Sequence, residues 1–224
     1  MTTGTRGLPA LGDALGPEPL RGRALFRAWF PVVTAAEMLG FAVPALVGAL
    51  TAASRAWVSV PALLLAGAVE GAVLGAGQAA VLSRAVPGLS RRRWVLATAG
   101  GAVVAYAIGL TPSTAADAIS GWPPLLLATL GAGLGLALLA TIGVAQWWVL
   151  RRHVPHAYRW IVATGLAWLA GLAVFLGFAM PLWQPGQPLA LVLAIGVAGG
   201  LLMAAAMAAV TGAALRRLLA GAGR

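Results

Sequence analysis

The chain has 224 residues, of which 61% are hydrophobic and 9% are charged, and its mean hydropathy is +0.92. A soluble domain is about 45–50% apolar and about 25% charged, and a chain of this size cannot enclose so much additional apolar surface in one core. The composition therefore excludes a soluble enzyme and a disordered chain, and it predicts a protein that crosses a membrane several times.

The ionisable residues are few and one-sided. Fifteen basic residues, all of them arginine, oppose five acidic residues, which gives a net charge of +10. The chain has no cysteine and no lysine, so thiolate metal sites, disulfides and Schiff-base cofactors are excluded. His153 and His156 lie in one polar loop without a third ligand nearby, and no catalytic motif occurs. We therefore expect no metal, no other cofactor and no enzymatic activity.

Long stretches without charge alternate with short segments that contain arginine. A membrane helix needs about 20 apolar residues, and in lipid only a helix satisfies its own backbone. We predict an all-α membrane domain over residues 25–224 with six transmembrane helices, at residues 28–50, 58–82, 94–114, 124–150, 160–181 and 189–215. Residues 1–24 are polar with several glycines and prolines, and we expect them to form a flexible cytoplasmic tail.

The arginines predict the orientation. Fourteen of the fifteen lie before the first span, after the last, or between an even span and the next odd one, and only Arg55 lies on the opposite side. Positive charge collects on the cytoplasmic side, so we predict a multi-pass protein of the bacterial inner membrane with both termini in the cytoplasm. This topology explains the arginines better than nucleic-acid binding does. The same side chains are suited to bind anionic lipids of the surrounding bilayer.

Landmarks recur along the chain at nearly constant intervals. Arginines that begin the odd spans are 66 residues apart, and a tryptophan follows each: Arg27, Arg93 and Arg159, with Trp29, Trp94 and Trp160. The even spans end at Arg84, Arg152 and Arg217. We predict three tandem, parallel helical hairpins, residues 27–84, 93–152 and 159–217, related by a pseudo-threefold axis along the membrane normal. The alternative is the ordinary alternation of arginine and tryptophan at membrane boundaries, which does not require constant intervals.

Tryptophans also precede the even spans, at Trp57, Trp122 and Trp183. Together with the first set, they predict two aromatic belts at opposite membrane interfaces.

The segments Gln78–Arg84 and Gln146–Arg152 share the pattern Gln-x-x-x-Leu-x-Arg, and each is followed by a short turn with proline and then by Arg-Trp. This pattern resembles uncharacterised bacterial multi-pass membrane proteins that carry the same repeated landmarks. The resemblance covers about residues 78–98 and 146–164. It implies a multi-pass membrane protein, and no known activity comes with it.

Glycines four residues apart recur on all three even spans. Such spacing lets two helices approach closely in lipid, where close packing replaces the hydrophobic effect. The residues are Gly67, Gly71 and Gly75 on the second span, Gly131 and Gly135 on the fourth, and Gly196 and Gly200 on the sixth. We expect contacts within the bundle. The alternative is a surface for a partner membrane protein or for a second copy of the chain.

Five polar residues are expected to form a layer on the cytoplasmic side. At ~1.5 Å per helical residue they lie ~8–9 Å from the arginines: Gln78, Thr98, Gln146, Thr164 and Thr211. We expect them to join the helices by hydrogen bonds. The alternative is that they line a cytoplasmic vestibule.

Two carboxyl groups lie deeper. Glu37 and Glu70 are ~15 Å and ~21 Å from the arginines, and Tyr106, at ~20 Å, is level with Glu70. A charge near the bilayer centre costs at least ~2.5 kcal/mol, and such residues usually face the interior and mark ion or proton paths. We therefore treat Glu37, Glu70 and Tyr106 as a candidate transport or proton site. The alternative is a neutral carboxyl with a structural role, because neither glutamate has a counterpart in the other hairpins.

Two functions follow. The first is a transporter or channel for a small solute or for protons that uses these carboxylates. The second is a non-catalytic membrane subunit or scaffold that packs against partners through its glycine faces. A water-accessible cavity at Glu70 favours the first function, and a fully packed centre favours the second.

Overall fold

The computed structural model describes residues 18–221, and that part of the chain contains seven helices and no strand. Six helices are long and apolar enough to cross a membrane. They are α1 (Gly22–Thr51), α2 (Ala56–Ala85), α3 (Arg91–Thr114), α5 (Pro124–Leu150), α6 (Arg159–Leu182) and α7 (Leu189–Gly221). A single turn, α4 (Ala116–Ile119), follows α3. The six predicted spans are thus confirmed as helices, and their ends differ from the prediction by at most six residues.

Residues 1–17 of the expected flexible tail lie outside the described residues. The end of that expected tail is ordered, because α1 already begins at Gly22. The backbone N–H of Leu20 donates to the carbonyl of Arg84 at 3.0 Å, and the guanidinium of Arg21 donates to the carbonyl of Ala85. These bonds attach the start of α1 to the end of α2.

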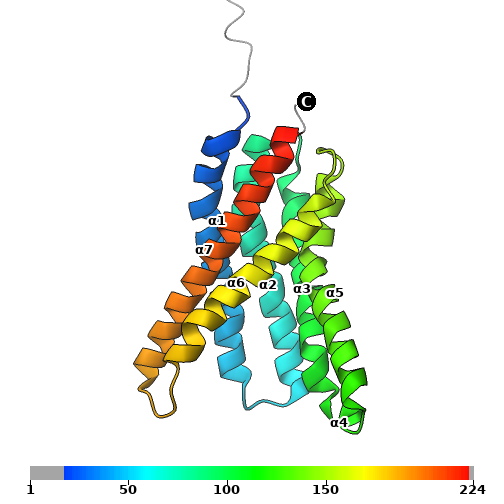
Figure 1. The fold of residues 1–224 in the computed structure, drawn as a ribbon, viewed down its shortest axis with the longest axis vertical. Coiled ribbons are helices and arrows are strands. Elements are labelled where there is room, and N and C mark those ends of the chain that lie inside the picture. The colour runs from blue at the N-terminus through cyan, green and yellow to red at the C-terminus, as the bar shows by residue number, and fades with distance from the viewer. Residues whose placement is uncertain (1–17, 222–224) are drawn as a thin grey trace, which may run out of the picture.

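The contacts between the six long helices form a closed ring. Each helix packs against its neighbours along the chain, and α1 packs against α7 to complete the circle. The start of α1 and the end of α7 lie at the same end of the bundle (Figure 1). Of the described arginines, all except Arg55 lie at this end, which we call the arginine end.

Packing is dense at the arginine end and loose at the other. Leu25, Leu82, Leu150 and Leu215 are each 0% exposed and belong to one large core cluster near the arginines. Toward the opposite end the helices diverge, and α6 and α7 lean away from α3 and α5 (Figure 1). Nearly every side chain in the outer half of α5 is exposed as a result, including Leu125 at 79%.

Proline and glycine determine where the outer turns fall. Helix α5 begins at Pro124. At the start of a helix a backbone N–H has no acceptor within the helix, so proline, which lacks this N–H, loses no hydrogen bond there. Gly186 lies in the turn between α6 and α7 with a φ of +81°, a backbone conformation that residues with a Cβ atom rarely adopt.

The first set of tryptophans corrects the predicted aromatic belt. Trp29, Trp94 and Trp160 are at most 1% exposed and meet inside the ring instead of at an interface. The ring centroid of Trp160 lies 6.0 Å from that of Trp29 and 6.2 Å from that of Trp94. Each indole finds a polar partner in the interior, so it gains nothing by reaching the membrane surface. In the second set, Trp57 and Trp122 are exposed.

The predicted glycine contacts hold on one helix and fail on another. A Cβ at Gly71 would lie 2.7 Å from the Cβ of Ala102 and 2.8 Å from the Cα of Ala99, so α2 and α3 touch there. Gly67 and Gly75 make similar contacts with α3. Gly131 and Gly135, in contrast, have nothing of the described chain within 4 Å of a Cβ position. They lie where α5 diverges, so the prediction that they pack within the bundle is wrong.

The two predicted glycines of α7 also lack the close backbone contacts that those of α2 make. Gly196 and Gly200 make only ordinary contacts, at 3.7 Å to Trp183 and 3.5 Å to Met38. The close contact of α5 occurs instead at Gly143, where a Cβ would lie 2.9 Å from the Cα of Ile161. Gly143 is on the densely packed half of the helix, which explains the difference.

Candidate functional site

The polar layer near the arginine end is a hydrogen-bonded network. Gln146 is 0% exposed. Its amide donates to Oε1 of Gln78 at 2.7 Å and to Oγ1 of Thr98 at 3.0 Å, and its Oε1 accepts from Nε1 of Trp160 at 2.7 Å. One side chain therefore joins α2, α3, α5 and α6.

The buried tryptophans all take part in this layer. Nε1 of Trp94 donates to Gln78 at 3.0 Å, and Nε1 of Trp29 donates to Oγ1 of Thr211 at 3.0 Å. The hydroxyls of Thr98, Thr164 and Thr211 each donate to a backbone carbonyl one turn earlier in their own helix. The structure thus joins four of the five predicted polar residues to other helices. Among the described residues, Thr164 bonds only within α6.

This layer closes the arginine end of the ring. Its five predicted members are at most 6% exposed, so they do not line a vestibule. The three indoles fill the centre beside them. Any path for a solute through the bundle must therefore open here by a rearrangement.

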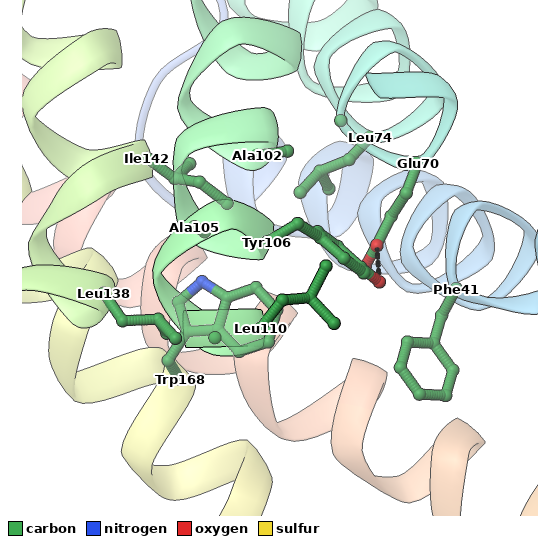
Figure 2. Close-up of a pocket in the computed structure, with 12 residues that line it drawn as sticks. Phe41, Glu70, Leu74, Ala102, Ala105, Tyr106, Leu110, Leu138, Ile142 and Trp168 are labelled. Atoms are coloured by element: carbon green, nitrogen blue, oxygen red, sulfur yellow. Dashed lines mark hydrogen bonds between the residues drawn. The ribbon is translucent and has the colours of Figure 1, made fainter. Parts of the chain in front are cut away.

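Beyond this layer, Glu70 and Tyr106 form a direct pair. The hydroxyl of Tyr106 on α3 donates to Oε2 of Glu70 on α2 at 2.7 Å (Figure 2). Glu70 is 5% exposed. Gly67, one turn before Glu70, makes room for the tyrosine, because a Cβ there would lie 2.4 Å from the ring. Glu70 and Tyr106, which were expected at the same depth in the membrane, are thus in direct contact.

Glu37 approaches the pair from α1 without joining it. It is 5% exposed, and within residues 18–221 no hydrogen bond reaches its carboxyl group. Gly40, one turn farther along α1, packs on Glu70 so closely that a Cβ would lie 3.1 Å from the Glu70 carbonyl oxygen. The structure therefore places Glu37 on the face of α1 that packs on α2, outside the lining of the cavity described below.

Glu70 and Tyr106 lie on the wall of a partly open cavity of about 280 Å³ between the helices (Figure 2). Side chains from five helices line it: Phe41, Glu70, Gly71, Leu74, Ala102, Ala105, Tyr106, Gly109, Leu110, Leu138, Ile142 and Trp168. Glu70 is the one carboxylate among these lining residues, and none of them is basic. Aromatic rings of Phe41, Tyr106 and Trp168 face the same space (Figure 2).

The cavity lies well away from the arginine end. Phe41, Glu70 and Leu138 are each fourteen residues along their helices from Arg27, Arg84 and Arg152, which corresponds to ~21 Å. Gln78 and Gln146 of the polar layer lie six residues from Arg84 and Arg152, which corresponds to only ~9 Å. The cavity is therefore separated from the arginine end by this layer and lies toward the half where the helices diverge.

Sequence reasoning missed Phe41 and Trp168. An aromatic residue within an apolar span gives little signal, because it fits a lipid-facing position equally well. Trp168 did offer one clue, since it lies nine residues past Arg159, or ~14 Å deep, far from the interfaces that tryptophan prefers.

In the described part of the chain, no group of three His, Cys, Asp or Glu residues is placed to hold a metal ion. In comparisons with known proteins, the chain matches no protein-family model, no curated protein and no solved structure. The geometry of the site is therefore what indicates the function.

Proposed function

We propose that the protein is a proton-linked transporter of a small solute and that Glu70 is the residue that binds the proton. The observation that carries this proposal is the Tyr106–Glu70 hydrogen bond on the wall of the partly open cavity between the helices. A carboxyl group this deep in a bilayer is costly as a free charge, so it holds a proton or pairs with a cation. Tyr106 fixes the direction of the carboxyl group toward the cavity.

The lining of the cavity favours a particular class of solute. The described lining residues include one carboxylate, no basic side chain and three aromatic rings. A cation is attracted both by a carboxylate and by aromatic faces, whereas an anion finds no partner. The volume of about 280 Å³ is at the small end of ligand sites. The solute we propose is therefore small, largely apolar and positively charged, and it exchanges with the proton on Glu70.

Glu37 is proposed as a second proton-binding group. It is buried on α1 beside the Gly40 contact with Glu70, and none of the described residues bonds to it. A proton that leaves Glu70 has this carboxyl as its nearest alternative among the described acidic groups.

The three predicted hairpins remain our proposal for the architecture. It is supported by a cyclic pattern of bonds, in which the even helix of one hairpin accepts from the tryptophan of the next: Gln78 from Trp94, Gln146 from Trp160 and Thr211 from Trp29. Packing agrees, since Gly75 lies on Val95 and Thr98 as Gly143 lies on Ile161 and Thr164. The carboxylate breaks this symmetry, because Leu138 and Met203 occupy the positions that match Glu70.

We further propose that the arginine end faces the cytoplasm of a bacterium and that the protein lies in the inner membrane. This orientation follows the positive-inside rule. The polar layer and the three indoles beside it then close the cytoplasmic side, and the structure corresponds to a state whose cavity lies toward the outer half of the membrane.

Proton flux in liposomes tests the proposal. The full chain is reconstituted, a small aromatic cation such as benzyltrimethylammonium is added, and internal pH is followed with a trapped dye. We expect wild-type protein to move protons out of the liposome as the cation moves in. Glu70→Gln should lose this flux, because the amide binds no proton. Tyr106→Phe should retain reduced flux, since it removes only the bond that orients the carboxyl.

Two matched controls separate this role from a general effect of substitution. Glu18→Gln alters a carboxylate outside the long helices, and Tyr158→Phe alters an exposed tyrosine at the arginine end. Both should behave like wild-type protein. Equal flux in Glu70→Gln and wild-type protein would remove Glu70 from the mechanism.

The second candidate function, a membrane subunit without transport activity, is favoured by one observation. Gly131 and Gly135, four residues apart, form an open face on the exposed half of α5, with nothing described within 4 Å of a Cβ position. The chain has no cysteine, so Gly131→Cys introduces a unique thiol on this face. Crosslinking of this variant to a partner, together with absence of flux in wild-type protein, would favour the subunit. An uncrosslinked monomer counts against it.

A further inference from the structure

The lipid-facing seam between α3 and α5 carries two adjoining grooves. The first, of about 510 Å³, lies at the arginine end and is lined by Arg93, Arg152, His153 and Ser90, among others. The second, of about 630 Å³, continues along the seam over glycine, alanine and aliphatic side chains. Both grooves share Leu96, Ala97 and Trp148, so they form one channel on the outer surface of the bundle.

The rim of this channel is suited to an anionic group. Arg93 at the start of α3 and Arg152 just after α5 contribute guanidinium groups from opposite sides, and no carboxylate is among the described lining residues. Arginine binds phosphate oxygens through paired N–H groups. Trp148 is 54% exposed beside the rim, and the guanidinium of Arg151 lies 3.5 Å from the centre of its ring. A tryptophan in this position is typical of a membrane interface.

The floor of the channel is suited to a hydrocarbon chain. Gly100, Gly101, Val104 and Ile108 of α3 face small residues of α5 across the seam. From Arg93 to Ile108 the channel extends fifteen residues, or ~22 Å, whereas the hydrocarbon region of one leaflet is about half of ~30 Å. Val104 and Leu96 are more than half exposed, so the floor opens to lipid.

We infer that this channel binds one anionic phospholipid from the cytoplasmic leaflet, with its phosphate between Arg93 and Arg152 and one acyl chain along the α3–α5 seam. The cavity at Glu70 plays no part in this site. The inference goes beyond the proposed transport function, and it would stand if transport failed. A shorter groove of about 220 Å³ occupies the matching position in the third hairpin, between Arg159 and Arg217. Its lining includes no apolar extension like that of α3 and α5, so we assign the lipid to the longer channel.

Retained lipid measured by native mass spectrometry tests this inference. The full chain is reconstituted in vesicles of equal phosphatidylglycerol and phosphatidylcholine and is then extracted in mild detergent. We expect wild-type protein to retain phosphatidylglycerol in preference to phosphatidylcholine. Arg93→Gln with Arg152→Gln should reduce this preference roughly tenfold, because each basic residue near an anionic surface contributes severalfold to binding.

The matched control removes two other exposed arginines of the same end, Arg84→Gln with Arg92→Gln, which line none of these grooves. It changes net charge equally and should retain wild-type preference. If both double variants lose phosphatidylglycerol equally, the arginines attract lipid only as a diffuse charge, and the site is refuted.

A second pair of variants tests the acyl groove. Gly100→Leu places a side chain in the channel, and a Cβ at Gly100 has nothing described within 4 Å, so the fold tolerates it. Retention of both lipids should fall in this variant and stay unchanged in Gly135→Leu, which is equally open but lies off the channel. Equal lipid retention in the Gly100→Leu and Gly135→Leu variants would refute the acyl-chain groove. Displacement of phosphatidylglycerol by inorganic phosphate alone would show that the site binds phosphate, and it would refute the proposal that the site binds a phospholipid.

Discussion

Gln146 is the side chain on which most of the polar layer depends. It makes three hydrogen bonds to three other helices while it is 0% exposed. In lipid, hydrophobic burial contributes little to helix association, and such bonds are worth about 0.6 kcal/mol each, up to about 2. A glutamine amide, which both donates and accepts, can join a donor such as indole N–H to an acceptor such as a threonine hydroxyl.

We predict that Gln146→Leu lowers the free energy of unfolding by about 2 kcal/mol, because it leaves the buried N–H of Trp160 without an acceptor. Reversible unfolding in mixed detergent measures this change. Gln184→Leu, in the exposed turn after α6, is the matched control and should be neutral. A double-mutant cycle with Trp160→Phe should recover about 1 kcal/mol of coupling. Independent, additive effects would contradict the bond.

At the scale of helices, small residues decide which pairs touch. Gly67, Gly71 and Gly75 bring α2 within backbone contact of α3, and this contact places Tyr106 on Glu70. Gly131 and Gly135 have the same spacing but lie on a part of α5 that has no neighbour. A glycine pattern therefore indicates that a helix can approach another, and the path of the neighbouring helix decides whether it does.

We predict opposite effects for one substitution at two glycines. Gly71→Ala should destabilise the bundle by about 1–3 kcal/mol, because the Cβ would meet backbone atoms of α3 that cannot yield. Gly135→Ala meets nothing and should be neutral or stabilising by up to about 1 kcal/mol through helix propensity. Unfolding of the two variants in the same detergent measures the difference. Equal destabilisation would argue that α5 packs against a partner at Gly135.

At the scale of the whole molecule, the ring is closed at one end and open at the other. The arginine end holds the indoles, the polar layer and the large leucine core, while the cavity lies in the diverging half. Such asymmetry is what a transporter needs if it exposes one site to two sides in turn. The proposed orientation can be measured directly, because the chain contains no cysteine.

We predict that Ser54→Cys reacts with a membrane-impermeant maleimide on intact cells and that Tyr158→Cys reacts only after lysis. Ser54 lies in the exposed α1–α2 turn at the open end, and Tyr158 is 53% exposed at the arginine end. The wild-type chain, which has no thiol, is the control for background. Labelling of Tyr158→Cys on intact cells would reverse the proposed orientation, although the ring and its cavity would be unaffected.

Depth along a helix was the most informative sequence measure. It placed Tyr106 level with Glu70, and the structure joins them at 2.7 Å. It also placed Gln78, Gln146 and Thr98 in one layer, where they bond to one another. Depth gives one coordinate only, so it could not tell that Glu37 lies outside the cavity lining or that Phe41 and Trp168 lie within it.

The amino-acid sequence alone determined the number of spans, their lengths and the single end that carries the arginines, because solvation in lipid constrains every residue of a helix whatever its neighbours are. Tertiary structure alone decided which faces meet. Rotation of a helix about its axis depends on the neighbours packed around it, and all sides of these helices are apolar. For this reason, the tryptophans expected at an interface lie in the core, and glycines with the same spacing are buried on α2 and open on α5.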